Sequence, residues 1–273
     1  YGLDLQKRFF GHFLKGEETG WKKQPKVLLN IRHPGEVFVP RTEKEWPLKR
    51  TKWTKAFLEP GTGALATKAP AKKQKSIYAG LGDGVTFLTP ARETAVELTG
   101  PLAAKLFVSS ETKDADLFLV VRLFAPDLKE VTFKGALDPH TPVAQGWLRA
   151  SHRKLDAKKS RRHKPYHSHD EEQLLKPGQV YELDIEVWPT SIVVPPGYRL
   201  GLTVRGTDYV YPGGSGGKLS NMKNEFTGVG PFIHDGRDAR VYGGNVTIHC
   251  GPIHPSHLLL PVVPPKGGGR KRS

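Results

Sequence analysis

The chain has 273 residues, of which 25% are charged and 37% hydrophobic, and its formal net charge is +15. This balance is typical of a folded chain rather than a disordered one, and the length allows one large domain or two modest ones. The single cysteine, Cys250, excludes an internal disulfide framework and a zinc site built on cysteines. No apolar run reaches the roughly 18 residues of a membrane-spanning helix, so we expect no membrane partner.

The first 32 residues predict one helix and one strand. Residues 3–15 carry large apolar side chains at helical spacing, and Gly16 follows as a C-cap. Residues 26–32 form an apolar, β-prone run between two prolines, which predicts a buried strand. These two elements resemble the end of an α/β unit. Because the chain begins at Tyr1 rather than at a methionine, we expect it to be a fragment or a processed piece.

Beyond residue 51 the chain is a series of short β-prone runs separated by Gly, Pro, Asp and Asn. Several runs alternate apolar and polar side chains, which indicates one buried and one solvated face. Such a series predicts a mainly β fold, an antiparallel sandwich or jelly roll. A loop is expected at 60–75 and a disordered basic tail at 264–273. The predicted strands are 51–58, 85–88, 94–98, 102–109, 116–124, 144–150, 180–187, 199–206, 245–249 and 257–262.

The positive charge is scattered and forms clusters only at 68–75, 149–164 and 270–272. Basic residues in loops and tails are more often solvated surface than a binding site. No nucleic-acid-binding motif accompanies them, so we expect no nucleic-acid partner. The low cysteine count fits a cytoplasmic location.

One segment imitates a catalytic motif. Residues 213–217 match G-x-S-x-G around Ser215, and Asp235 and His254 follow in the order of an α/β-hydrolase triad. A nucleophile elbow needs a strand leading in and a helix leading out, whereas here a proline precedes and four glycines surround the serine. We therefore predict no catalytic residue in this segment.

Histidines provide the candidate metal ligands. His167 and His169 are separated by one residue, so in an extended segment both imidazoles could reach one metal ion. Neighbouring arginines and lysines would repel a dication, which makes a polar loop the alternative interpretation. His249, His254 and His257 are better explained by packing and capping near two prolines.

Two pairs of carboxylates are spaced closely enough to be candidate calcium ligands. Asp114 lies near Asp116, and Asp235 near Asp238, but the D-x-[DN]-x-[DN]-G loop is absent. Turn formation is the simpler role for these aspartates. The sequence therefore predicts no metal and no cofactor, apart from the weak histidine candidates.

Four blocks of sequence resemble sequence motifs of one enzyme family and occur in the same order as in that family. They are similar to the C-terminal region of the X-Pro dipeptidyl-peptidase and cocaine-esterase (CocE/NonD) family of serine hydrolases. The blocks are 5–21 (LQKRFFGHFLKGEETGW), 45–58 (EWPLKRTKWTKAFL), 97–116 with 146–153 (ELTGPLAAKLFVSSETKDAD, GWLRASHR), and 187–208 with 255–261 (VWPTSIVVPPGYRLGLTVRGTD, PSHLLLP).

The resemblance implies a parent enzyme with an α/β-hydrolase domain, a helical cap and a C-terminal jelly roll that is galactose-binding-like. It implies that residues 1–50 are the last helix and strand of the hydrolase domain and that 51–263 form the jelly roll. The family's Ser-His-Asp triad would lie upstream of Tyr1, so none of it maps onto this chain. The implied partners are the upstream hydrolase domain and a small ester or peptide substrate, and a homodimer is allowed.

A free-standing β-sandwich that binds carbohydrate or another ligand is the alternative function. The amphipathic helix at residues 3–15 argues against it, because a self-contained module has no use for a helix without its sheet. We therefore expect a non-catalytic domain that packs on a hydrolase domain and shapes its pocket or a dimer contact.

Overall fold

The computed structural model describes residues 1–135, 138–212, 229 and 236–265, and these residues are mainly β-strand. No helix among them is long and apolar enough to cross a membrane. The elements are α1 (Gly2–Lys15), η1 (Trp21–Lys23), β1 (Val27–His33), β2 (Val37–Glu43), β3 (Lys52–Glu59), β4 (Ala64–Ala66), β5 (Gln74–Ala79), β6 (Val85–Leu88), β7 (Val96–Ser110), β8 (Asp116–Phe124), β9 (Glu130–Val131), β10 (Ala144–Arg149), η2 (Ala150–His152), β11 (Tyr181–Val194), β12 (Arg199–Arg205), α2 (Ala239–Tyr242), β13 (Asn245–Cys250) and β14 (His257–Val263).

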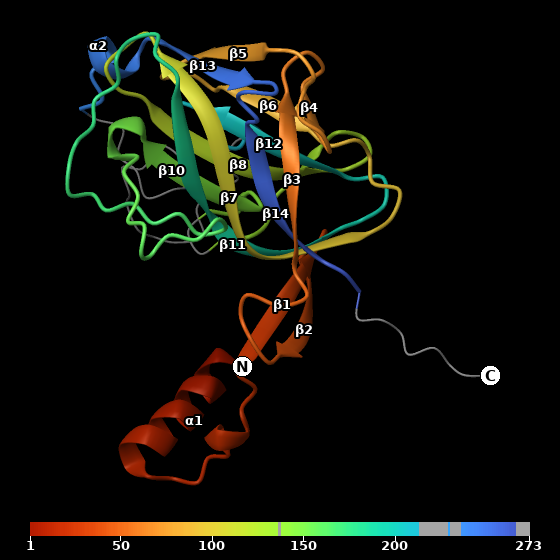
Figure 1. The fold of residues 1–273 in the computed structure, drawn as a ribbon. Coiled ribbons are helices and arrows are strands. Elements are labelled where there is room, and N and C mark those ends of the chain that lie inside the picture. The colour runs from red at the N-terminus through yellow and green to blue at the C-terminus, as the bar shows by residue number, and fades with distance from the viewer. Residues whose placement is uncertain (136–137, 213–228, 230–235, 266–273) are drawn as a thin grey trace.

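Nine strands pair in a closed ring, in the order β7-β11-β10-β8-β12-β6-β4-β3-β14 and back to β7 (Figure 1). A sandwich predicts two separate sheets, whereas this ring is continuous. Two of its joints are narrow, because β10 meets β11 only at Gly146 and Val187, and β4 meets β6 only at Ala64 and Leu88. The strands β13 and β5 extend the sheet beyond β7, and β9 pairs with β8.

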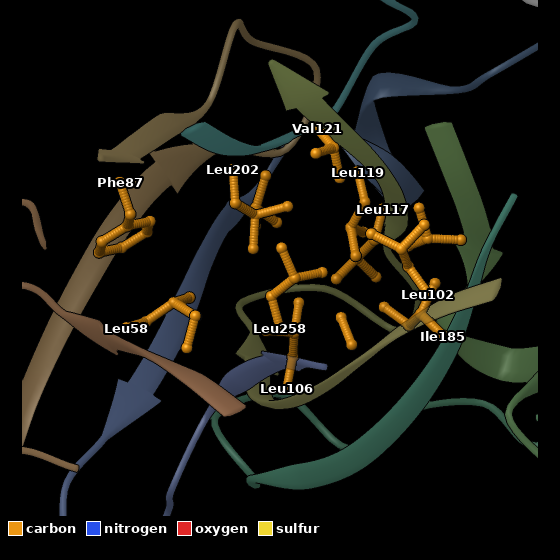
Figure 2. Close-up of a cluster of buried hydrophobic side chains, with 14 of the residues drawn as sticks. Leu58, Phe87, Leu102, Leu106, Leu117, Leu119, Val121, Ile185, Leu202 and Leu258 are labelled. Atoms are coloured by element: carbon orange, nitrogen blue, oxygen red, sulfur yellow. The ribbon is translucent and has the colours of Figure 1, made fainter. Parts of the chain in front are cut away.

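Leucine-rich inner faces of the strands form the core inside the ring. Leu58, Leu106 and Leu258 project inward from β3, β7 and β14 (Figure 2). They pack in one cluster with Leu119 of β8 and Leu202 of β12, and all five side chains are fully buried. Burying one leucine contributes about 1.5 to 3 kcal/mol, so this cluster adds to the hydrophobic free energy that stabilises the fold.

Residues 1–43 form an arm that projects from one end of the β body (Figure 1). The helix α1 ends at Gly16, which has the left-handed φ of 69° expected of a C-cap and so confirms that prediction. The strands β1 and β2 pair as an antiparallel hairpin. Only one residue pair, Arg32 with Ile192, joins β1 to β11. The prediction of a buried strand at 26–32 is wrong, because only Ile31 of β1 is buried.

The β-strand predictions hold in position and differ in length. The runs predicted at 85–88 and 116–124 are β6 and β8. The two runs predicted at 94–98 and 102–109 form the single strand β7, which continues through Gly100. Its partner β11 is also longer than predicted, with a register shift between Val187 and Thr190 that bends the long pair.

The expected loop at 60–75 is partly wrong. It contains β4 and the start of β5, and Leu65 of β4 is only 2% exposed. A three-residue strand with a single large apolar side chain carries no alternation that a sequence can reveal. Of the predicted tail at 264–273, residues 266–273 lie outside the described residues.

Candidate functional site

Two of the three residues in the apparent triad, Ser215 and Asp235, lie outside the described residues. The third, His254, packs among aromatic rings. Its ring centroid is 5.1 Å from that of Phe107 and 5.7 Å from that of His249. These contacts are typical of packing, and the absence of a catalytic residue stays a prediction.

The histidine pair predicted as a weak metal site does come together. The rings of His167 and His169 are 5.9 Å apart, and Nδ1 of His169 is 3.2 Å from Nδ1 of His152. His167 Nε2 is 3.0 Å from the backbone oxygen of Asp184, to which it donates. Burial lowers the pKa of His167. In the described part of the chain, no group of three or more His, Cys, Asp or Glu residues is placed to hold a metal ion.

His249 and His257 have structural partners, which agrees with the packing interpretation. His249 Nε2 lies 2.8 Å from Ser109 Oγ, and His257 Nδ1 donates to the backbone oxygen of Pro255 at 2.7 Å. Burial lowers the pKa of both histidines and favours their neutral forms.

Asp114 joins two separate segments of the family-like sequence. Its Oδ1 accepts hydrogen bonds from the backbone N–H of Ala115 at 2.8 Å and of Ser151 at 2.9 Å, and its Oδ2 accepts one from Ser151 Oγ at 2.6 Å. Asp114 and Ser151 are both at most 1% exposed. Burial raises the pKa of Asp114, and these hydrogen bonds partly oppose that increase. The aspartate therefore fastens the β7–β8 connection to η2 and is not a calcium ligand in this arrangement.

Asp116 makes the second link between the same segments. Arg149 donates to its two oxygens from Nε at 2.8 Å and from Nη2 at 3.0 Å, and Arg237 Nε donates to Oδ2 at 3.0 Å. The hydrogen bond to Asp116 raises the pKa of Arg149. Hydrogen bonds and an ion pair thus join the D-x-D and R-x-S motifs that resemble the family. Asp114, Asp116 and Ser151 are buried, whereas Arg149 is exposed.

Ion pairs fix the arm to the β body. Arg41 of β2 donates to both carboxylate oxygens of Glu97 in β7, each at 2.6 Å. Burial alone would raise the pKa of Glu97, but the hydrogen bonds from Arg41 and Thr99 hold it below its ordinary value. Arg32 of β1 donates to the backbone oxygen of Val143 at 2.8 Å. Because bidentate arginine–carboxylate pairs are geometrically specific, the hairpin has a defined orientation.

Contacts within the arm join α1 to the turn that follows it. Phe9 and Phe13 of α1 pack against Trp21 of η1, with ring centroids 5.2 and 6.4 Å apart. Thr19 Oγ1 donates to the backbone oxygen of Arg8 at 2.7 Å, and Arg8 Nε donates back to the oxygen of Thr19 at 3.2 Å. These contacts hold the turn after the helix against its middle.

Several apolar side chains of the arm are exposed in the described chain. Leu3, Phe10 and Leu14 of α1 are 72%, 50% and 76% exposed. On β2, three successive apolar side chains are about half exposed: Val37, Phe38 and Val39. Scattered exposed apolar residues are ordinary, but such a group on one projecting arm marks an interaction surface. We call these six residues the arm surface, and it is the candidate functional site.

Comparison with known proteins identifies the family of the chain. Residues 19–259 match the family model described as the X-Pro dipeptidyl-peptidase C-terminal non-catalytic domain. The chain belongs to this family. Membership confirms the resemblance drawn from the four sequence blocks, and nothing in the comparisons favours a free-standing binding module.

The relatives are longer proteins. A cocaine esterase of Rhodococcus is 24% identical over 95% of this chain and 45% of its own length. A putative Xaa-Pro dipeptidyl-peptidase of Rhodopirellula baltica is 24% identical over 77% of this chain and 33% of its own. A crystal structure of a CocE/NonD family hydrolase from Staphylococcus aureus superposes with a TM-score of 0.82 at 27% identity, covering 96% of this chain and 45% of that one. The chain thus spans less than half the length of these relatives.

Sequence reasoning missed the contacts that build the site. It identified the amphipathic helix but not the hairpin partner β2 with its exposed Phe38. The pairing of Arg41 with Glu97 joins residues 56 positions apart, and no local pattern signals it. The β-prone run Val37–Val39 was the available signal for a strand at this position, although Pro40 and the polar residues after it show no alternation.

Proposed function

We propose that this chain packs, through the arm surface, on an α/β-hydrolase domain encoded upstream of Tyr1. The proposal rests on the exposed apolar side chains of an arm whose hairpin is held on the β body by Arg41, Glu97 and Arg32. A hairpin held in one orientation suits a permanent partner, because this part of the arm needs no reordering to bind. The non-catalytic family and the greater length of its relatives support this partner.

The proposal extends to the domain division and to the parent's chemistry. Residues 1–50 would complete the hydrolase domain, 51–263 would form the non-catalytic domain, and 264–273 would be a tail. The parent would transfer acyl groups from small esters or peptides, with a serine nucleophile, a histidine base and an oxyanion hole, all upstream of Tyr1. The names of the relatives support these substrate classes. We also propose that the parent protein forms a homodimer. The single cysteine supports a cytoplasmic location for it.

We further propose that the nine-strand ring is a flattened jelly roll. Its two narrow joints divide it into two layers, β11-β7-β14-β3-β4 and β10-β8-β12-β6. Within each layer the strands pair over several residues, as for the six pairs of β10 with β8. The leucine core between the layers supports this description.

Hydrogen exchange tests the partner surface. We compare the parent protein with this chain alone and follow the amides of α1 by mass spectrometry. A helix packed on a sheet opens rarely, so α1 should exchange at least about tenfold more slowly in the parent. Equal exchange rates in the two proteins would refute the packing.

A pair of variants of the parent localises the contact. Phe10→Asp places a charge on the arm surface, whereas Ile253→Asp makes the same kind of change at a loop residue that is 66% exposed. Losing a buried phenylalanine contact costs about 1.5 to 3 kcal/mol. Phe10→Asp should therefore speed α1 exchange and lower the melting temperature, and Ile253→Asp should change neither.

The chain alone should not react with a fluorophosphonate probe.

A further inference from the structure

A pocket of about 400 Å³ lies on the outer side of the β body, away from the residues of the arm surface. Its floor is apolar and buried, and consists of Ala103 and Ala104 of β7 and Leu259 of β14. One wall is the segment 154–170, which we call the basic loop. This volume suits a small organic molecule that can rest on the apolar floor.

The basic loop is held in place at several points. The ring of His163 stacks on that of Trp53 in β3, with centroids 4.5 Å apart and planes 10° apart. The hydrogen bond from His167 to Asp184 ties its far end to β11. Within the loop, the backbone N–H of Asp156 donates to Tyr166 at 2.8 Å. The wall is therefore part of the folded structure, which reduces the entropy cost of binding a ligand there.

The rim of the pocket is cationic. Lys55, Arg161 and Arg162 line it, and in the described chain none of the three makes an ion pair. The carboxylate of Asp184, which also lines the pocket, is already paired with Lys105 at 2.9 Å. The rim thus presents three positive charges without an acidic partner.

One rim group is also oriented in advance. Arg161 Nη1 donates to the backbone oxygens of Lys158 at 2.9 Å and of Ser160 at 2.7 Å, which fixes the guanidinium plane. Its remaining N–H groups make no hydrogen bond with the described residues. A planar guanidinium with free donors recognises phosphate oxygens in pairs.

We propose that this pocket binds a small organic phosphate, with the apolar body on the Ala103–Leu259 floor and the phosphate among Lys55, Arg161 and Arg162. A phosphate monoester carries close to two negative charges and three acceptor oxygens, and so matches three cations better than a single carboxylate does. The proposal does not depend on the arm surface or on the parent's activity. It also gives a role to the basic loop and to His167, for which the family assignment offers none.

Binding of phenyl phosphate to the purified chain tests the proposal, with calorimetry and NMR as readouts. Phenyl phosphate should bind at least about tenfold more tightly than benzoate, inorganic phosphate or phenol, because only phenyl phosphate uses both floor and rim. Its binding should weaken as salt concentration rises. The amide signals of Ala103 and Arg162 should shift on titration.

Variants at exposed positions test the role of the rim and provide a control. Lys55→Ala and Arg162→Ala should each weaken binding of phenyl phosphate by about tenfold. Lys52→Ala removes the same charge from the same strand at a residue that does not line the pocket, and should leave binding unchanged. The proposal is overturned if Lys52→Ala weakens binding as much as Lys55→Ala, if inorganic phosphate binds as tightly as phenyl phosphate, or if phenyl phosphate does not bind.

Discussion

Replacing Asp114 by alanine tests whether the segments around Asp114 and Ser151 stabilise each other. The change removes the acceptor of three hydrogen bonds, two of which come from the backbone N–H groups of Ala115 and Ser151. Both residues are at most 1% exposed, so water cannot take the place of the carboxylate without opening the structure. The variant therefore leaves two buried donors without a partner.

The expected cost follows from these contacts. A buried donor left unsatisfied costs about 1 to 3 kcal/mol, so two of them cost roughly 2 to 6 kcal/mol. A domain of this kind has a free energy of unfolding of about 5 to 15 kcal/mol. With a urea dependence of about 3 kcal/mol per molar, Asp114→Ala should lower the unfolding midpoint by roughly 0.7 to 2 M.

Asp114→Asn is the matched control for this prediction. The amide oxygen can still accept from both backbone N–H groups, and Ser151 Oγ can accept from the new amide nitrogen. Because burial raises the pKa of Asp114, its ionised form is disfavoured by folding at neutral pH, and a neutral side chain avoids this penalty. Asp114→Asn should therefore cost much less than Asp114→Ala.

Urea unfolding at pH 7, followed by tryptophan fluorescence, measures both variants. The argument is refuted if Asp114→Ala costs under about 1 kcal/mol, or if alanine and asparagine cost the same. A double-mutant cycle with Ser151→Ala then measures the coupling between the two side chains.

Gly146→Ala should destabilise the chain by about 1 to 3 kcal/mol, because its Cβ would lie 2.3 Å from the backbone oxygen of Glu186. Gly2→Ala meets no atom within 4 Å and should be neutral in the same urea assay; equal effects would contradict the steric reason. Lowering the pH should also reduce stability from about pH 6.5 downward: burial lowers the folded-state pKa values of His249 and His257 below 6.5, so the unfolded chain binds protons first. Urea midpoints that stay constant between pH 7.5 and pH 5 would contradict this.

Local patterns were sufficient for much of the fold. The apolar spacing in residues 3–15 and the glycine that follows define α1, because a helix and its cap involve only residues a few positions apart. The β-prone runs at 116–124 and 199–206, bounded by turn residues, located β8 and β12 for the same reason. The family phrases identified the class of domain before any contact was known.

Other features depend on partners far away in the sequence. Leu65 became a core residue because β4 fills a gap between β3 and β6, which its own three residues do not indicate. The basic stretch at 149–164 was interpreted as solvated surface, yet part of it forms the wall of a pocket. Its position there depends on the stacking of His163 on Trp53, 110 residues earlier in the chain.

The sequence by itself determined α1 and most of the longer strands, the mainly β class and the family, because helix periodicity, strand alternation and short motifs are local properties. Only the tertiary structure decided which charges are partnered. Asp114, Asp116 and Glu97 find donors on segments far away in the sequence, whereas Lys55 and Arg162 have no carboxylate partner among the described residues at a pocket rim. The formal charge of +15 is a sum over the whole chain, but its effect depends on distances between side chains, and those distances are set by folding.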